Sequence, residues 1–264
     1  MTHSSADQSL VLTADEAGVR TLTLNRPEAR NALSMGLMKA LTEALVAAGQ
    51  DPAVKVVVLA AAGPAFSAGH DLKEMRSQPR RDAYEAVFAR CAELMKTVVR
   101  LPKPVIAKVH AMATAAGCQL VASCDLAVAA EGAKFATPGV NIGLFCSTPM
   151  VALSRVVGRK QAMDMLLTGR PVEAREALAM GLVNRVVPAA ELDREVAALA
   201  SGIAAKSPIT LAIGKEAFYR QMEMGLDEAY AFTAGVMTTN MMTADAAEGI
   251  DAFIEKRQPV WKGC

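Results

Sequence analysis

An α/β body followed by a helical C-terminal region is the architecture that this 264-residue chain indicates. Short continuous apolar runs at 54–63 (VKVVVLAAAG) and 103–110 (KPVIAKVH) are typical of strands buried on both faces. Segments with helical apolar spacing separate these runs, which implies the crossover connections of a layered α/β protein. From about Pro149 onward the pattern changes to nearly continuous helix.

The chain begins with a predicted β-hairpin, because residues 9–13 and 19–27 alternate apolar and polar side chains around ADEAG. Ser34 is placed to cap the helix that follows. In chain order, the expected elements are a helix over 34–50, strand 54–63, a helix over 81–99, strand 103–110, a helix from Ala115, strand 125–130 and strand 182–187 within the later helices. We expect residues 1–200 to form the core and residues 201–264 a helical oligomerisation region.

Charge composition excludes some partners. Lys and Arg total 28 against 27 Asp and Glu, so the net charge of +1 offers no field that would attract nucleic acid or an anionic membrane. No apolar run reaches the ~18 residues of a membrane span. We therefore expect neither a nucleic-acid partner nor a membrane span, and any anionic ligand must be held by local groups.

The cysteines and histidines of the chain indicate its cellular location and whether a metal site is expected. The five cysteines are odd in number, lack a C-x-x-C pair and mostly lie in apolar runs, which favours reduced, buried thiols. The first 18 residues show no basic segment followed by an apolar one, so we expect no leader and a cytoplasmic location. The three histidines form no ligand-spaced cluster, so no metal site is expected.

Five late methionines stand at helical spacing: Met222, Met224, Met237, Met241 and Met242. Methionine in this pattern usually fills gaps, so we expect these side chains in the core or at a subunit interface. An adaptable binding surface is the alternative.

Two segments share one plan of buried strand, small-residue loop and helix. In FSAGHDLKEM (66–75), small residues allow a ligand to approach the backbone, and Asp71 is placed to cap a short helix. In 103–125, the N–H groups of Ala116 and Gly117 would lie at a helix N-terminus, where the dipole favours negative charge. Two such amides converging on one carbonyl oxygen would form an oxyanion hole.

These segments carry a resemblance to a known family. NRPEARNAL, FSAGHDLKEM, KPVIAKVHAMATAAGCQLVASCDLAVAA, FATPGVNIGL, TGRPVEAREALAMGLVNRVVP and AFIEKRQPVWK together resemble the crotonase superfamily of enoyl-CoA hydratases and isomerases. The resemblance implies a ClpP/crotonase-like spiral of ββα units, a helical C-terminal trimerisation region, and a homotrimer or dimer of trimers. It also implies an acyl-CoA thioester as ligand, with coenzyme A entering as part of the substrate and no separate cofactor.

Carried onto this chain, the resemblance gives the backbone N–H groups of His70 and Ala116 the role of binding the thioester oxygen. Alanine at 116 suits this role only with a negative φ. The remaining positions that it implies for coenzyme A binding are Arg26, Ala29, Ala68, Asp71, Leu72, Lys73 and Gly117, with Phe253 and Lys256 reaching a neighbouring subunit's ligand. Solvated surface charge is the alternative reading of Arg26 and Lys73.

The two glutamates that hydratases of this family use as acid and base are missing. Their positions hold Gln119 and Gly139. An amide can orient water or substrate but has no useful pKa near neutrality, and glycine has no side chain. Since a positioned acid or base contributes roughly 10²- to 10⁴-fold, we expect ordinary hydration to be weak or absent.

Other residues could replace the lost groups. The His70 imidazole is one candidate, and Asn141, Thr137 and Ser147 are polar substitutes beside Gly139. For Cys146 and Cys118 a buried inert thiol competes with a nucleophile. Two functions stay open: an enzyme that needs only oxyanion stabilisation, such as a decarboxylase or thioesterase, and a non-catalytic acyl-CoA binding protein.

Overall fold

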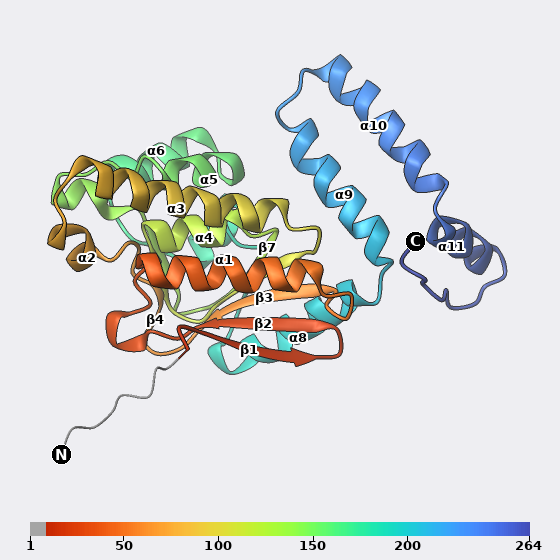
Figure 1. Ribbon diagram of the computed structural model, residues 1–264, viewed down its shortest axis with the longest axis horizontal. Coiled ribbons are helices and arrows are strands. Elements are labelled where there is room, and N and C mark those ends of the chain that lie inside the picture. Colours follow the sequence, from red (N-terminus) through yellow and green to blue (C-terminus); the bar gives the residue numbers. More distant parts are fainter. Residues whose placement is uncertain (1–8) are drawn as a thin grey trace.

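Two β-sheets organise the body of the protein in the computed structural model, which describes residues 9–264 (Figure 1). The larger sheet has the strand order β1-β2-β3-β5-β7-β10 and the smaller has the order β4-β6-β8-β9. The pairs β1–β2 and β8–β9 are antiparallel, and all the other described pairs are parallel. The strands are β1 (Val11–Glu16), β2 (Val19–Leu24), β3 (Val56–Ala61), β4 (Ala65–Ser67), β5 (Val105–Val109), β6 (Met112–Thr114), β7 (Leu126–Ala130), β8 (Lys134–Ala136), β9 (Val172–Glu173) and β10 (Arg185–Val187).

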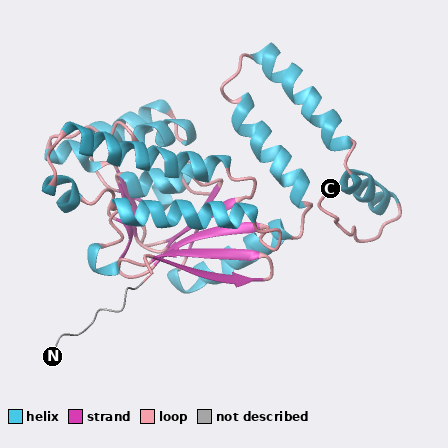
Figure 2. Ribbon diagram, viewed as in Figure 1, coloured by secondary structure: helices cyan, strands magenta, loops and turns pink. Residues whose placement is uncertain are grey.

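Helices cover the sheets and continue into the C-terminal region (Figure 2). The α-helices are α1 (Met35–Gln50), α2 (Leu72–Ser77), α3 (Arg81–Arg100), α4 (Ala116–Ser123), α5 (Pro149–Val156), α6 (Arg159–Thr168), α7 (Ala174–Met180), α8 (Leu192–Ala204), α9 (Pro208–Gln221), α10 (Leu226–Met241) and α11 (Ala244–Ile254). Three short 3-10 helices are η1 (Pro27–Ala29), η2 (Pro138–Ile142) and η3 (Ala189–Glu191).

A ββα unit repeats along the body. In each unit a longer strand joins the larger sheet, a three-residue strand joins the smaller sheet, and helical segments follow. The units begin at β3, β5 and β7, and their short strands are β4, β6 and β8. The predicted α/β architecture of ββα units is therefore confirmed.

The strands of the larger sheet are buried on both faces, as the apolar runs predict. In β3, Val57 and Leu59 belong to the core that includes buried side chains of α1, α3 and α4, whereas Val56 and Val58 pack with α8. Because successive side chains of a strand point to opposite faces, a continuous apolar run fills two cores at once.

Most predicted elements are present, and their caps explain their starts. The hairpin is β1–β2, and the Ser34 hydroxyl accepts the Leu37 N–H at 3.2 Å at the start of α1. The short strands of the smaller sheet were not predicted, because two or three residues are too few to show a period of two. The strand expected over 182–187 is shorter, at Arg185–Val187.

The C-terminal helices α9, α10 and α11 project from the body as an arm (Figure 1). The expected division at residue 200 falls inside α8, whose buried face packs on the larger sheet and continues to Ala204. Of the late methionines, Met222, Met237, Met241 and Met242 are exposed and Met224 is half-buried. These methionines do not fill the core of this chain. A subunit interface and an adaptable binding surface remain as the two interpretations.

Burial of the cysteines agrees with the expectation for four of five positions, because Cys91, Cys118, Cys124 and Cys146 are buried and free while Cys264 is exposed. Across residues 9–264 no single helix has both the length and the apolar character needed to cross a membrane. The segments 189–204 and 208–221 meet that test only as a pair bent by 102°. The predicted lack of a leader falls partly on residues 1–8, which lie outside the described residues.

Candidate active site

Three loops of the smaller sheet meet at one edge. Strands β4, β6 and β8 are parallel neighbours, so the segments that follow them leave the same edge of the sheet. These segments carry His70 after β4, Ala115 and Ala116 after β6, and Thr137 to Gly139 after β8. The topology thus brings together most of the positions that the sequence singles out.

The backbone N–H of His70 points away from its neighbouring strand segment. Leu33 forms a parallel bridge with His70, in which the Leu33 N–H donates to the Gly69 carbonyl at 2.7 Å and the Asp71 N–H donates to the Leu33 carbonyl at 3.3 Å. In a parallel bridge the flanking residues make these bonds, so the His70 N–H faces the opposite side. No described residue accepts a hydrogen bond from it.

Ala116 begins α4, and its N–H also lacks an acceptor among residues 9–264. The first N–H groups of a helix have no intrahelical partner. Ala116 is not among the residues with positive φ, so the condition for alanine at this position is met. The positive φ falls on Ala115, at φ 49° and ψ −117°, a conformation that is costly for alanine.

Close backbone contacts join the two loops. A Cβ built on Gly69 would lie 3.4 Å from the Ala116 nitrogen and 2.8 Å from the Ala115 Cβ. One built on Gly117 would lie 2.5 Å from the Ser67 carbonyl oxygen. Glycine at both positions lets the loops approach closely, which brings the His70 and Ala116 segments side by side.

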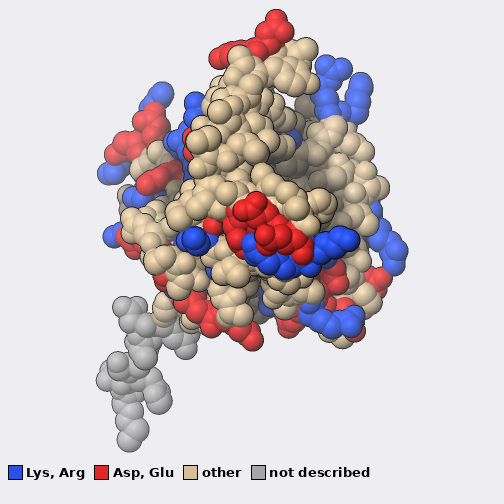
Figure 3. All heavy atoms as spheres, turned by 90° about the vertical axis from the view of Figure 1, so that its right-hand side faces the viewer, with Lys and Arg blue, Asp and Glu red and all other residues tan. Residues whose placement is uncertain are grey.

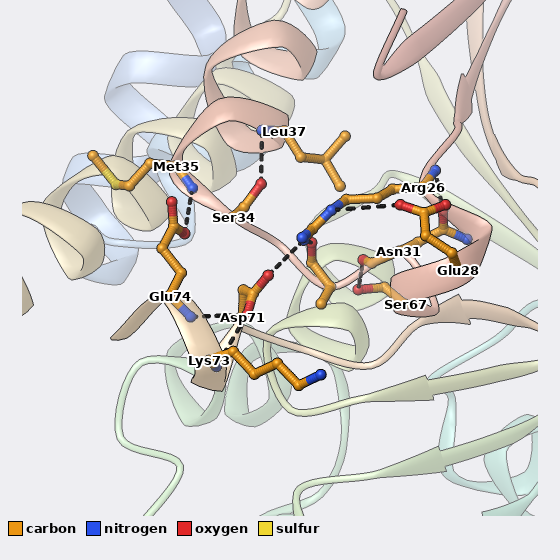
Figure 4. A network of polar contacts seen from close by, with 11 residues as sticks. Arg26, Glu28, Asn31, Ser34, Met35, Leu37, Ser67, Asp71, Lys73 and Glu74 are labelled. Carbon is orange, nitrogen blue, oxygen red and sulfur yellow. Dashed lines mark hydrogen bonds and ion pairs between the residues drawn. The ribbon is translucent and has the colours of Figure 1, made fainter. Parts of the chain in front are cut away.

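Asp71 joins the first loop to the N-terminal segment (Figure 4). Its carboxylate accepts the N–H groups of Lys73 and Glu74, each at 3.0 Å, and pairs with Arg26 Nη1 at 2.6 Å. Arg26 also donates to the Ala32 carbonyl at 3.2 Å. Burial would raise the pKa of Asp71, but these hydrogen bonds and the Arg26 charge lower it overall. Asp71 therefore caps α2, as predicted, and Arg26 is an ion-pair partner rather than a solvated surface charge.

Asn31 supports the same loop and was missed by the sequence reasoning. It is fully buried with a φ of 52°, and its side-chain amide donates to the Ala62 and Ala65 carbonyls at 2.8 and 2.9 Å. Its backbone carbonyl accepts the Ser67 hydroxyl at 2.9 Å. Asparagine tolerates positive φ better than most residues, which is the only signal that the sequence offers.

The remaining predicted coenzyme A positions divide into two groups. Ala29 lies in η1, Ala68 is exposed and donates its N–H to the Arg30 carbonyl, and the exposed Leu72 and Lys73 begin α2. Figure 4 shows the Lys73 side chain extending away from the Asp71 carboxylate. Phe253 instead lies in the last turn of α11 and Lys256 lies just beyond that helix, apart from these loops within one chain (Figure 1).

Gln119 is buried on α4 and contacts α3. The Cys91 thiol donates to Gln119 Oε1 at 3.7 Å, within the range for a sulfur donor. Cys91, which the sequence reasoning did not connect with the site, is fully buried, and burial raises the pKa of its thiol to about 12. The thiol therefore keeps its proton at neutral pH.

The space beside Gly139 is filled. A Cβ built on Gly139 would lie 2.7 Å from the Leu144 carbonyl oxygen and 2.9 Å from Cys146 Sγ. Asn141 is exposed, and its side-chain nitrogen packs against Gly169. Ser147 is also exposed and donates to the Phe145 carbonyl. A longer side chain at position 139 would require the 144–146 segment to move.

His70 is half-buried, and its imidazole packs edge-on against Phe88, with ring centroids 5.6 Å apart. Burial lowers the pKa of His70 to about 4. The ring is therefore neutral at pH 7, and its Nε2 atom is buried without a hydrogen-bond partner in the described chain. A pKa this far below neutrality makes the imidazole a poor general base.

Thiol and metal chemistry have little support at this site. Burial raises the pKa of both Cys118 and Cys146, which is typical of inert buried thiols. Within residues 9–264, His, Cys, Asp and Glu side chains form no group of three or more that could hold a metal ion. Among the described residues, the His70 and Ala116 backbone N–H groups remain without an acceptor and are available to a ligand.

Comparison with known proteins identifies the family. The enoyl-CoA hydratase/isomerase family profile matches residues 14–264. Enoyl-CoA hydratase domain-containing protein 3, mitochondrial, from Rattus norvegicus is 46% identical over 97% of this chain and 85% of its own length. The protein of the same name from Homo sapiens is 48% identical over 92% of this chain and 80% of its own length.

These relatives correct the expected location. Five curated relatives, from rat, mouse, frog, zebrafish and human, are named mitochondrial, which contradicts the predicted cytoplasmic location. The prediction rested on reduced cysteines and on the absence of a secretory pattern. Neither property separates one intracellular compartment from another, so the inference was too narrow.

Solved structures agree with the family match. An enoyl-CoA hydratase from Mycobacterium smegmatis superposes with a TM-score of 0.93 at 57% identity, covering 96% of this chain and 98% of that one. Human enoyl-CoA hydratase domain-containing protein 3 superposes with a TM-score of 0.93 at 46% identity, covering 96% and 100%. With its repeated ββα units, this chain belongs to the enoyl-CoA hydratase/isomerase family, the crotonase superfamily.

Proposed function

We propose that this protein binds an acyl-CoA thioester at the edge of the smaller sheet and hydrates enoyl-CoA weakly or not at all. The thioester oxygen would accept the N–H groups of His70 and Ala116, which together form an oxyanion hole. The observation that carries the proposal is that these two amides, on loops in backbone contact, donate to no described residue. Each donor of such a pair is worth ~3 kcal/mol to a transition state that carries negative charge.

Weak hydration follows from the side chains around the amides. Gln119 replaces one family glutamate and Gly139 the other, and neither can exchange a proton near pH 7. Asp71 is committed to Arg26 and to the cap of α2. The neutral His70 imidazole has a pKa of about 4, so it is a poor match for an acid or base working at neutrality.

Two functions remain compatible with such a site. Loss of CO₂ from an acyl group leaves an enolate without needing a base, and two backbone donors would stabilise that enolate. Thioester hydrolysis would rely on the same stabilisation. Binding without turnover, as a protein that sequesters or senses acyl-CoA, is the second function.

The test pairs calorimetric binding of crotonyl-CoA with loss of its enoyl absorbance. We expect wild type to bind with little turnover and Gln119→Glu to gain hydration, with Gln50→Glu on the exposed end of α1 as the matched control. Gly139→Glu is unsuitable, because its Cβ would meet the Leu144 carbonyl. If crotonyl-CoA does not bind, the whole proposal is refuted. Rapid hydration by wild type would refute the statement that hydration is weak or absent.

We also propose that the α9–α11 arm builds a homotrimer or a dimer of trimers. Phe218, Leu226, Tyr230, Met242 and Phe253 are each more than half exposed in the single chain. Uncharged residues cover much of the face from which the arm projects (Figure 3). An exposed apolar surface of this kind is typical of an interface. Light scattering should give a mass of three or six chains that Tyr230→Glu lowers, and a monomeric wild type would contradict the proposal.

A further inference from the structure

The contact between Cys91 and Gln119 determines which end of the Gln119 carboxamide is held against α3. Cys91 Sγ lies 3.7 Å from Gln119 Oε1, and both side chains are buried, at 0% and 5% exposure. The thiol donates its hydrogen to this carbonyl oxygen, whereas its sulfur would accept only weakly from the NH₂ group. The carbonyl end of the carboxamide is therefore held against α3.

The NH₂ end remains available. Gln119 Nε2 donates to no described residue, yet it is not one of the buried atoms without a hydrogen-bond partner, which near these loops are His70 Nε2 and Thr137 Oγ1. It therefore keeps contact with solvent. Helical side chains lean toward the N-terminus of their helix, and residues three apart share a face, so the Gln119 side chain lies on the same face of α4 as Ala116.

A second donor near the same loops also lacks a partner. Thr137 is 1% exposed, and its hydroxyl has no partner in the described chain. It follows Ala136, whose carbonyl accepts the Ala115 N–H at 2.8 Å. A buried hydroxyl without a partner is uncommon in folded proteins and points to a ligand atom or water.

We propose that Cys91 is a positioning residue that turns the Gln119 NH₂ group toward the acyl chain, and that the site selects acyl-CoA thioesters whose acyl group carries a carboxylate. The inference rests on the proposed function. The Gln119 NH₂ group and the Thr137 hydroxyl are neutral donors that favour an anionic oxygen, whereas a glutamate at position 119 would repel it. The paired Asp71 carboxylate adds no free negative charge to this edge.

The experiment compares two thioesters of similar shape. Malonyl-CoA ends in a carboxylate, and isovaleryl-CoA places two methyl groups where malonyl-CoA has two oxygens. We expect calorimetry to give wild type about tenfold tighter binding of malonyl-CoA, the size of one hydrogen bond to a charged group. Gln119→Glu should abolish or reverse this ratio.

Cys91 variants separate positioning from packing. Cys91→Ala removes the donor and should reduce the malonyl-to-isovaleryl ratio at least threefold, and Cys91→Val, which fills the space without a donor, should reduce it to the same extent. A malonyl-to-isovaleryl affinity ratio near one in wild type overturns the proposed preference for acyl groups that carry a carboxylate. A ratio that Cys91→Ala leaves unchanged, or that Cys91→Val preserves, overturns the positioning role. Failure of both thioesters to bind refutes the proposed function instead.

Discussion

Gly117 on α4 lies so close to Ser67 at the end of β4 that a Cβ on Gly117 would stand 2.5 Å from the Ser67 carbonyl oxygen. This contact joins the loop after β4 to the helix after β6, and it sets the distance between the His70 and Ala116 amides. Any side chain at position 117 must push the two loops apart.

Gly117→Ala is therefore expected to destabilise the fold by about 1–3 kcal/mol, the cost of overpacking a tight contact. It should also weaken acyl-CoA binding, because the two amides separate. Urea unfolding and calorimetry would measure these effects. Gly132→Ala is the matched control, since a Cβ there meets nothing within 4 Å, and equal losses in both variants would contradict the role of the contact.

Asp71→Asn should lower stability at pH 7 by about 1–2 kcal/mol, because it removes the charge that pairs with Arg26 but keeps a side chain able to cap α2. The folded pKa of Asp71 is lowered, so its contribution is full above the unfolded value near 4 and is lost as pH falls through the folded pKa. Urea unfolding at several pH values should show the variant and wild type converging in acid.

The control for Asp71→Asn is Asp82→Asn. Asp82 pairs with Arg80, and both of these side chains are exposed. We expect its effect to stay within about 0.5 kcal/mol. A difference between Asp71→Asn and wild type that persists unchanged into acid would show that the carboxylate charge is not the source of the stability.

His70 should make the protein less stable in mild acid. Its folded pKa of about 4 lies below the unfolded value of about 6.5, so the unfolded chain binds a proton first as pH falls. Stability is full above pH 6.5 and is lost toward pH 4, by about 2–3 kcal/mol. His70→Gln should remove this loss in urea unfolding, with His110→Gln as control, and a His70 imidazole titrating near 6.5 by NMR would contradict the assignment.

Lys215 anchors the arm to the body. Its ammonium is buried and donates to Asp125 Oδ2 at 2.7 Å and to the Val98 and Lys103 carbonyls, each at 3.0 Å, and Tyr219 donates to Asp125 Oδ1 at 2.9 Å. Lys215→Met should cost about 3 kcal/mol or more, because Asp125 would lose its charge partner.

Thermal and urea unfolding would measure that cost, and Arg220→Met is the control, because Arg220 forms an exposed pair with Glu216 on the same helix. Tyr219→Phe should cost about 1 kcal/mol, the value of one hydrogen bond. Similar small effects for Lys215→Met and Arg220→Met would mean that the network does not hold α9 on the body.

Local patterns along the chain were enough to predict the strand and helix order. Apolar runs identified β3, β5 and β7, and the capping residues Ser34 and Asp71 identified the starts of α1 and α2. Both kinds of prediction succeed because strand burial on two faces and helix capping depend on a few residues that are adjacent in the sequence. That Gln119 and Gly139 stand where hydratases of the family have glutamates follows from the family resemblance and not from a local pattern.

Contacts between distant segments could not be read in this way. The pairing of Arg26 with Asp71, the hold of Cys91 on Gln119 and the filled space beside Gly139 each join residues that only folding brings together. The strands β4, β6 and β8 are too short to show a period, yet their pairing places the site loops at one edge. Residue types and local periods depend on neighbours along the chain, whereas a side chain's partner, burial and pKa depend on neighbours in space.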